Sequence, residues 1–143
     1  QIILKLRDEE EYKPKGSSQK TSEESLRKKI IRQIDGVVTD NITKPSKKTV
    51  WDGGAEIDIY YENKDTKKVV FYELKIDKAI PKDVYQLEMY WDGLVYANKE
   101  IESAILVAET FDAKVQKVIE NINKKLDAKG NKYNITYKES SKF

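Results

Sequence analysis

Cysteine and histidine are both missing from this 143-residue sequence, and proline (three) and methionine (one) are scarce. Without cysteine the chain cannot form a disulfide or a thiolate metal site. Without histidine it cannot carry a Ser-His-Asp or Cys-His triad, a histidine general base or the usual zinc sites. Any catalysis must therefore depend on carboxylates, lysine, tyrosine or a hard cation held by oxygen ligands.

Long apolar runs are missing as well. No stretch approaches the roughly 18 residues that span a bilayer, and no signal peptide is visible, so we expect a cytoplasmic protein without a membrane partner. Charged residues make up 36% and apolar residues 38% of the chain, and the net charge is +2. This balance predicts a globular domain, while bulk charge neither indicates nor excludes nucleic-acid binding.

The sequence has the length of one domain, preceded by a segment of different character. Residues 1–20 combine a short apolar run at 2–6 with a charged run and a stretch that contains Pro, Gly and Ser. We interpret them as a linker or tail from a preceding domain, with an edge strand at 2–6 as the alternative. Residues 21–143 are the expected folded domain. Because the chain begins with Gln1, we interpret it as a piece of a longer polypeptide.

Hydrophobic periodicity predicts alternating helices and strands. A capping box at Thr21 and Glu24 opens a helix that is expected to end at Asp35-Gly36. The elements expected after it are a weak strand at 37–42, a basic loop at 44–48, a hairpin of strands at 55–62 and 69–76, a helix at 81–97, a strand at 104–108, a helix between 112 and 130, and a strand at 133–137. This succession predicts an α/β fold with a mixed sheet.

Three polar residues occupy hairpin positions where a strand buried in a core would carry apolar side chains. Glu73 and Lys75 share one face of the second strand because side chains alternate. A turn centred on Asp65-Thr66 places Asp58 opposite Glu73, with Cβ atoms about 4.5–5.5 Å apart. Two carboxylates at this spacing repel each other unless a positive charge lies between them. Mg²⁺ is the expected occupant, since it binds a few carboxylates together with water and phosphate oxygens.

The chemistry that this arrangement implies is hydrolysis of a phosphodiester. A divalent cation lowers the pKa of a bound water and acts as a Lewis acid on the phosphoryl oxygen. Lys75 would stabilise or orient the attacking hydroxide, and charge stabilisation would be the main catalytic contribution. The alternative is a cross-strand salt bridge among Asp58, Glu73 and Lys75 without any chemistry.

Asp58, followed after fourteen residues by Glu73-Leu74-Lys75, resembles the motif of the PD-(D/E)xK nuclease superfamily, which includes restriction endonucleases, Holliday-junction resolvases and recombination exonucleases. The resemblance implies a restriction endonuclease-like core of order αβββαβ, followed here by an extra helix and strand. It also implies that Asp58, Glu73 and the backbone carbonyl of Leu74 bind the metal and that Lys75 is the catalytic lysine. The sequence departs from the motif at Ile57, where the motif has proline.

Two further features fit branches of this superfamily. Some branches carry a glutamate on the first helix that reaches the metal, and Glu23 is the candidate here. For Glu23, the alternative is an acidic residue in the first turn that the helix dipole favours without any metal contact.

Gln86 and Tyr90 resemble the Q-xxx-Y motif of the exonuclease-like branch and lie one turn apart on a helix. Gln86 would bind a phosphate or the water shell of the metal, unless it is only a polar surface residue.

The substrate-binding candidates are Tyr90 and two lysines of the basic loop. Tyr90 would stack on a base or contact the nucleic-acid backbone, and a core position is its alternative. Lys47 and Lys48 would contact phosphates, with solvated surface charge as the alternative for each.

Together these features predict a Mg²⁺-dependent nuclease, with Mn²⁺ able to substitute, whose partner is nucleic acid, with DNA favoured over RNA. The expected context is a larger restriction, repair or phage-defence protein. A homodimer is also open, since two strands need two sites. The alternative is a catalytically inactive nuclease-like fold that binds DNA or protein.

Overall fold

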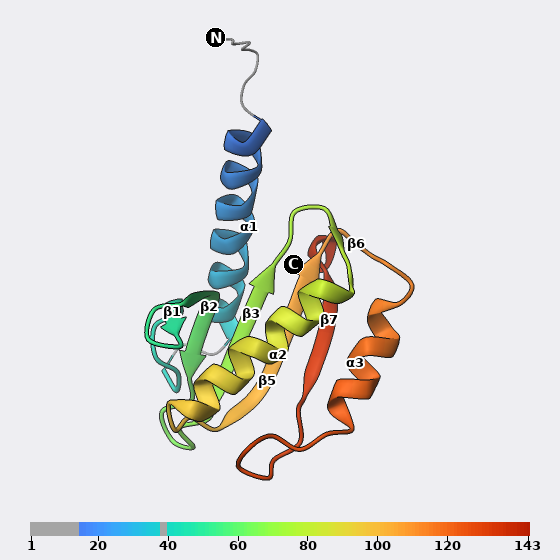
Figure 1. Cartoon of the computed structure of the whole chain (residues 1–143). Coiled ribbons are helices and arrows are strands. Elements are labelled where there is room, and N and C mark those ends of the chain that lie inside the picture. Colours follow the sequence, from blue (N-terminus) through green and yellow to red (C-terminus); the bar gives the residue numbers. More distant parts are fainter. Residues whose placement is uncertain (1–14, 38–39) are drawn as a thin grey trace.

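The computed structural model describes residues 15–37 and 40–143 (Figure 1). Its elements are α1 (Lys15–Val37), β1 (Ser46–Val50), β2 (Ala55–Glu62), β3 (Val69–Leu74), β4 (Lys78–Ala79), α2 (Pro81–Tyr96), β5 (Ile101–Ala108), β6 (Thr110–Phe111), α3 (Val115–Asn123), β7 (Ile135–Glu139) and the 3₁₀ helix η2 (Ser140–Lys142). The expected order of helices and longer strands is confirmed, with β4, β6 and η2 in addition.

One five-stranded mixed sheet, in the order β1-β2-β3-β5-β7, forms the centre of the fold. The pairs β1–β2 and β2–β3 are antiparallel, whereas β3–β5 and β5–β7 are parallel. Parallel neighbours need a crossover, and α2 and α3 supply the two crossovers. A second sheet consists of the parallel pair β4 and β6.

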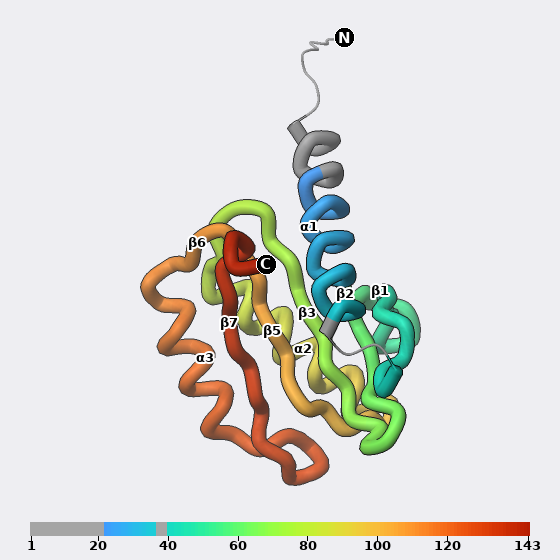
Figure 2. The backbone as a smooth tube through the Cα atoms, turned by 180° about the vertical axis from the view of Figure 1, so that it is seen from behind, coloured from blue at the N-terminus to red at the C-terminus, as the bar shows by residue number. Residues whose placement is uncertain are grey.

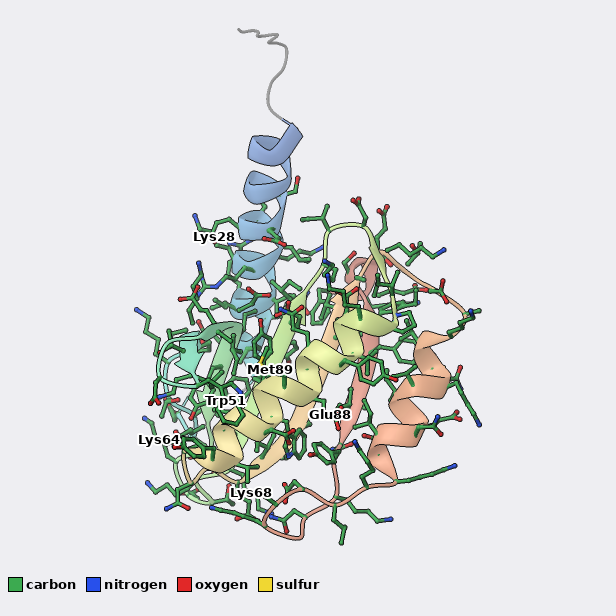
Figure 3. The ribbon with its side chains drawn as sticks, in the orientation of Figure 1. Lys28, Trp51, Lys64, Lys68, Glu88 and Met89 are labelled. Atoms are coloured by element: carbon green, nitrogen blue, oxygen red, sulfur yellow. The ribbon has the colours of Figure 1, made fainter. Side chains whose placement is uncertain are left out.

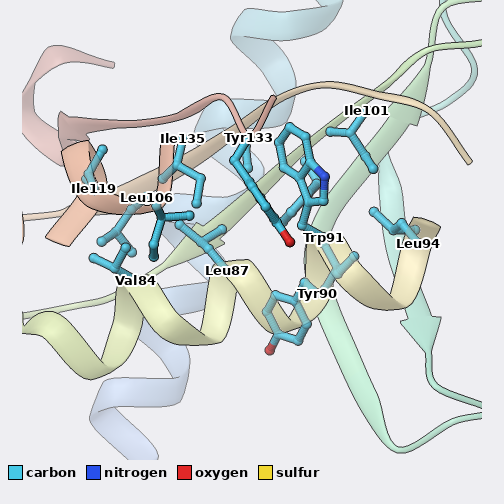
Figure 4. Packing of buried hydrophobic residues seen from close by; sticks show 14 of the residues in the cluster. Val84, Leu87, Tyr90, Trp91, Leu94, Ile101, Leu106, Ile119, Tyr133 and Ile135 are labelled. Carbon is cyan, nitrogen blue, oxygen red and sulfur yellow. The ribbon is translucent and has the colours of Figure 1, made fainter. Parts of the chain in front are cut away.

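The sheet is covered on both faces, which is why its central strands β3 and β5 consist mainly of buried apolar residues. Ile30 and Ile34 of α1 pack on one face, which lies in front in Figure 2. Helices α2 and α3 pack on the other face, where Figure 4 shows Leu87 beside Leu106 and Trp91 beside Tyr133. Among the described helices, none is both long and apolar enough to cross a membrane.

Helix α1 begins earlier than the capping box predicted. Lys15 is already helical, so Thr21 lies inside the helix, and α1 continues to Val37. Glu24 is not a capping residue, and its carboxylate lies 3.6 Å from the guanidinium of Arg27. A capping signal is a local preference that longer-range packing overrides. Residues 1–14 of the expected tail lie outside the described residues, and the domain boundary stays a prediction.

The first strand is also misplaced in the sequence-based prediction. Of the strand expected at 37–42, residues 38 and 39 lie outside the described residues, and Ile42 forms only an isolated bridge with Asn63. The strand is β1, which begins inside the expected basic loop at 44–48, extends two residues beyond it and is mostly exposed. Edge strands often carry lysine, which discourages pairing with other chains. The lysines of this segment therefore led to the prediction of a loop where the structure has an edge strand.

The last helix is shorter than predicted. Helix α3 ends at Asn123, so Leu126 lies outside it and is 60% exposed. The following loop is organised by Asp127, whose carboxylate accepts hydrogen bonds from the indole N–H of Trp91 and from the backbone N–H of Asn131. A side chain that satisfies backbone groups in this way offers the chain an alternative to helix.

Candidate active site

The hairpin of β2 and β3 has the predicted register. Ile59 pairs with Tyr72 and Tyr60 with Phe71 in an antiparallel ladder. The ladder ends at the pair of Ile59 and Tyr72, and the next residues of the two strands are Asp58 and Glu73, which lie close enough for the carboxylate of Asp58 to act on that of Glu73. The two carboxyl-bearing residues therefore lie close together, although they are 15 residues apart in the sequence.

A β-bulge interrupts β2 at Asp58. Ser46 pairs with Tyr60 but Lys48 pairs with Ile57, so β2 has one residue more than β1 between these pairs. Strict alternation, which the sequence predicted, fails here because Ile57 and Ile59 pack in the cores on opposite faces of the sheet. Bulges redirect side chains and are frequent beside active sites, and this one sits at the candidate catalytic aspartate.

Asp58 is held at both its backbone and its side chain. The Nε of Arg27 donates a hydrogen bond of 2.9 Å to its carbonyl oxygen, and the backbone N–H of Leu74 donates one of 2.9 Å to Oδ2. The bulge disturbs the ordinary ladder, and these two contacts replace it. As a result, the position of the carboxylate is coupled to α1 and to the end of β3.

Glu73 is 7% exposed, and its Oε1 has no hydrogen-bond partner among the described residues. Burial raises the pKa of Glu73 to about 10, and the neighbouring carboxylate of Asp58 adds to the rise. A buried carboxyl is normally hydrogen-bonded or paired. An orphaned carboxylate oxygen near a second carboxyl therefore fits a site for a cation.

A cleft of about 450 Å³ opens beside Asp58, between α1 and the sheet, and Glu73 is not among the residues that line it. Its lining residues are Glu23, Glu24, Arg27, Lys47, Asp58 and Leu74. Glu23 is exposed at its rim, yet partial burial in the cleft and the nearby charge of Asp58 raise its pKa. The described residues contain no cluster of three acidic side chains that would enclose a metal by themselves, so further ligands would come from the backbone, water or substrate.

Of the two lysines predicted to contact phosphates, the structure brings one to the cleft. Lys47 lines it, whereas the ammonium of Lys48 lies 5.3 Å from the centre of the Tyr60 ring. Successive residues of a strand point to opposite sides, so the two lysines separate. Lys48 is engaged in a cation–π contact away from the cleft lining.

Lys75 follows the last residue of β3, and its backbone N–H donates to the carbonyl of Val107. Its side chain is 39% exposed, and Nζ lies 3.5 Å from Oδ1 of the buried Asp83. The charge of Lys75 opposes the rise in the pKa of Glu73. The ammonium therefore acts on the carboxyl pair from the side of α2.

Tyr90 of α2 lies near the carboxyl pair and Gln86 contacts Tyr90, but neither residue lines the cleft between α1 and the sheet. The side-chain amide of Gln86 donates a hydrogen bond of 2.9 Å to the Tyr90 hydroxyl. Burial, together with the charges of Glu73 and Asp58, raises the pKa of Tyr90 to about 12. The ring of Tyr90 is buried edge-on against Phe71, so the hydroxyl rather than the ring faces the site.

Sequence reasoning missed two residues of this arrangement. Arg27 belongs to a basic face of the first helix, with Lys28, Lys29 and Arg32, for which the sequence predicts either phosphate contacts or solvated surface charge. The one local sign of its place at the site is its position one turn after Glu23. Asp83 was not noticed, although an acid two residues after Pro81 is typical of a helix start. Both residues act through tertiary contacts that local patterns do not reveal.

Solved structures of similar fold include a repair endonuclease from Pyrococcus abyssi, with a TM-score of 0.59 and 20% identity over 92% of this chain and 49% of that one. EndoMS in its apo form matches with a TM-score of 0.53 and 19% identity, over 82% of this chain and 47% of that one. The EndoMS–dsDNA2 complex matches with a TM-score of 0.52 and 18% identity, over 80% and 44%.

This chain spans about half the length of each of these structures. No protein-family model and no curated protein matches the sequence. At these identities the likeness is one of fold. The chain therefore shares the α/β fold of these repair endonucleases, with its five-stranded mixed sheet, as expected for the restriction endonuclease-like core that the sequence motif predicted.

Proposed function

We propose that this chain hydrolyses phosphodiester bonds of DNA at a divalent-metal site formed by Asp58 and Glu73. The observation that carries the proposal is the buried Oε1 of Glu73, which lies near Asp58 and has no hydrogen-bond partner among the described residues. The fold likeness to repair endonucleases, one of them in a complex with dsDNA, supports a nuclease and supports DNA as the substrate.

The donor set fits Mg²⁺, with Mn²⁺ as a substitute. The carboxylates of Asp58 and Glu73 and the carbonyl oxygen of Leu74 would hold the ion, and Glu23 at the cleft rim would reach it directly or through water. Mg²⁺ takes few protein carboxylates and keeps places for water and phosphate oxygens. When bound, it would supply Lewis-acid polarisation of the phosphate and activation of a water nucleophile.

The chain's own residues would bind the phosphate and stabilise its charge. Lys47 and Arg27 line the cleft and would contact phosphate oxygens. As the oxygen of water bonds to phosphorus, the bond from phosphorus to the leaving sugar oxygen breaks, and that oxygen takes up a proton. Negative charge grows on the phosphate during this step, and the ammonium of Lys75 would stabilise it. Gln86 would hold the attacking water or a phosphate oxygen.

Cleavage of DNA by point variants tests this proposal. The purified chain is incubated with linear, circular and single-stranded DNA in the presence of Mg²⁺ or Mn²⁺. Asp58→Ala and Lys75→Ala are each expected to lower the cleavage rate by about a hundred-fold or more, because the first removes a ligand of the ion and the second removes a cation that stabilises the developing negative charge.

Asp65→Ala is the matched control, since Asp65 is an exposed residue of the turn between β2 and β3, at the other end of the sheet. It should cleave like the wild type. Equal cleavage by Asp58→Ala and the wild type would show that the activity does not come from this site. A wild type that binds DNA without cutting it would favour a nuclease-like binding module.

A further inference from the structure

We propose that Asp83 is a positioning residue, which holds the ammonium of Lys75 beside Asp58 and Glu73 with the same carboxylate that begins helix α2. The inference rests on the proposed nuclease function for its catalytic meaning. The contact itself rests on the described side chains alone.

The two carboxylate oxygens of Asp83 contact different partners. Oδ2 accepts a hydrogen bond of 2.8 Å from the backbone N–H of Ile80, which precedes α2. Oδ1 lies 3.5 Å from Nζ of Lys75. The residue is only 4% exposed, so its charge depends on these partners, because a buried carboxylate without them is strongly disfavoured.

Lys75 needs such a partner to keep one position. Its backbone is fixed by the hydrogen bond from its N–H to Val107, but its side chain has four rotatable bonds and is more than one third exposed. Within the described part of the chain, Asp83 is the acidic residue within 4 Å of the ammonium. Without it, the ammonium would sample many orientations in solvent.

The contact also fixes Lys75 relative to the rest of the site. Asp83 lies one turn before Gln86 on α2, and Gln86 contacts Tyr90 one turn later. Lys75 at the end of β3 is thereby tied to the helix that carries these two residues. A catalytic group displaced by about 1 Å can lose about a hundred-fold in rate, so this link is expected to matter for turnover.

Asp83→Asn separates the two tasks of the residue. An asparagine oxygen can still accept the hydrogen bond from Ile80, whereas the charge that attracts Lys75 is lost. We expect kcat for cleavage of linear DNA to fall by about ten- to a hundred-fold, with KM and the melting temperature close to those of the wild type. Asp83→Ala should lose the same activity and also melt several degrees lower.

A second measurement does not depend on activity or on metal. The NMR signals of the two Cε protons of Lys75 are observed in protein labelled with ¹³C-lysine and are assigned by comparison with Lys75→Arg. In the wild type these two protons should have separate chemical shifts, because Asp83 holds the side chain in one position. The two signals should merge in Asp83→Asn. Asp65→Asn, in the distant hairpin turn, is the matched control, and in this variant the signals should stay separate and the activity should equal that of the wild type.

The two measurements distinguish failure of the inference from failure of the proposed function. Asp83→Asn with wild-type kcat and unmerged Lys75 signals would overturn the inference and leave Asp83 as a helix cap. A wild-type chain that cleaves no DNA would overturn the nuclease function, while the lysine signals would still decide whether Asp83 holds Lys75.

Discussion

Glu73 and Asp83 are both buried acidic residues, but they differ in whether their carboxylate oxygens have partners. Both oxygens of Asp83 have partners in Ile80 and Lys75. One oxygen of Glu73 has none among the described residues, and burial raises the pKa of Glu73 to about 10. A buried carboxyl group with a raised pKa is a candidate for function, because a bound cation can supply the positive charge that stabilises its ionised form.

The pKa of Glu62 is lowered by folding, in contrast to the raised pKa of Glu73. Its Oε2 accepts hydrogen bonds from the ammonium of Lys99 (2.7 Å) and the hydroxyl of Tyr60 (2.6 Å). The bond from Lys99, followed by that from Tyr60, lowers the pKa of Glu62. A lowered folded-state pKa stabilises the protein above the unfolded-state pKa, and this contribution disappears as the pH falls through the folded-state value.

Glu62→Gln should therefore lower the free energy of unfolding by about 1 kcal/mol at pH 7. The difference from the wild type should shrink below about pH 4, where the wild-type carboxylate also becomes protonated. Urea unfolding at both pH values measures it, with the exposed Glu139→Gln as control. A difference that stays constant down to pH 3 would contradict the assigned ion pair.

Local patterns suffice for residues whose role follows from position in the hairpin. The proximity of Asp58 and Glu73 and the place of Lys75 at the end of β3 follow from the hairpin register that the turn sets, although alternation in β2 fails at Asp58. Arg27 and Asp83 could not be predicted, because their contacts with Asp58 and Lys75 depend on how two helices pack beside the sheet.

At the scale of elements, prediction failed where a charge pattern concealed the structure. Strand β1 reads as a basic loop because it lies at the sheet edge and exposes most of its residues. Helix α1 passes through a sequence that is typical of a helix start. The hairpin and α2 were predicted closely, because each has an apolar face whose period identifies the element. Strand β5 begins at Ile101, three residues before the predicted start, because Glu102 and Ser103 interrupt its apolar run.

The turn after β1 packs on α2 through an unusually close approach (Figure 3). The indole N–H of Trp51 donates to the carbonyl of Met89, and its ring stacks on Tyr96 at 5.2 Å. A Cβ at Gly93 would lie 2.7 Å from the indole nitrogen and 3.0 Å from Cβ of Val50. The missing side chain of Gly93 therefore makes room for the turn.

Gly93→Ala should destabilise the protein by about 1 kcal/mol, because overpacking costs about 1–3 kcal/mol and better helix propensity returns up to about 1 kcal/mol. Urea unfolding measures the change. In a Trp51→Ala background the same substitution should be neutral or stabilising, since most of the crowding is gone. Equal effects in both backgrounds would disprove the close contact as the cause.

At the scale of the whole molecule, the sheet brings the site together from segments far apart in sequence. Asp58 and Glu73 come from the antiparallel hairpin, Glu23 and Arg27 from the helix on one face, and Gln86 from the helix on the other. The order of elements predicted this architecture. The bulge at Asp58 was not predictable, because it arises from pairing between two strands and not from either strand alone.

The central claim is that Asp58 and Glu73 form a cation site, and calorimetric titration of the purified chain with Mn²⁺ tests it most directly. We expect the wild type to bind the ion, and Glu73→Gln, which keeps the shape of the side chain but not its charge, to lose most of the binding. Asp65→Asn should bind like the wild type. Unchanged Mn²⁺ affinity in Glu73→Gln, or no binding by the wild type, would contradict the claim.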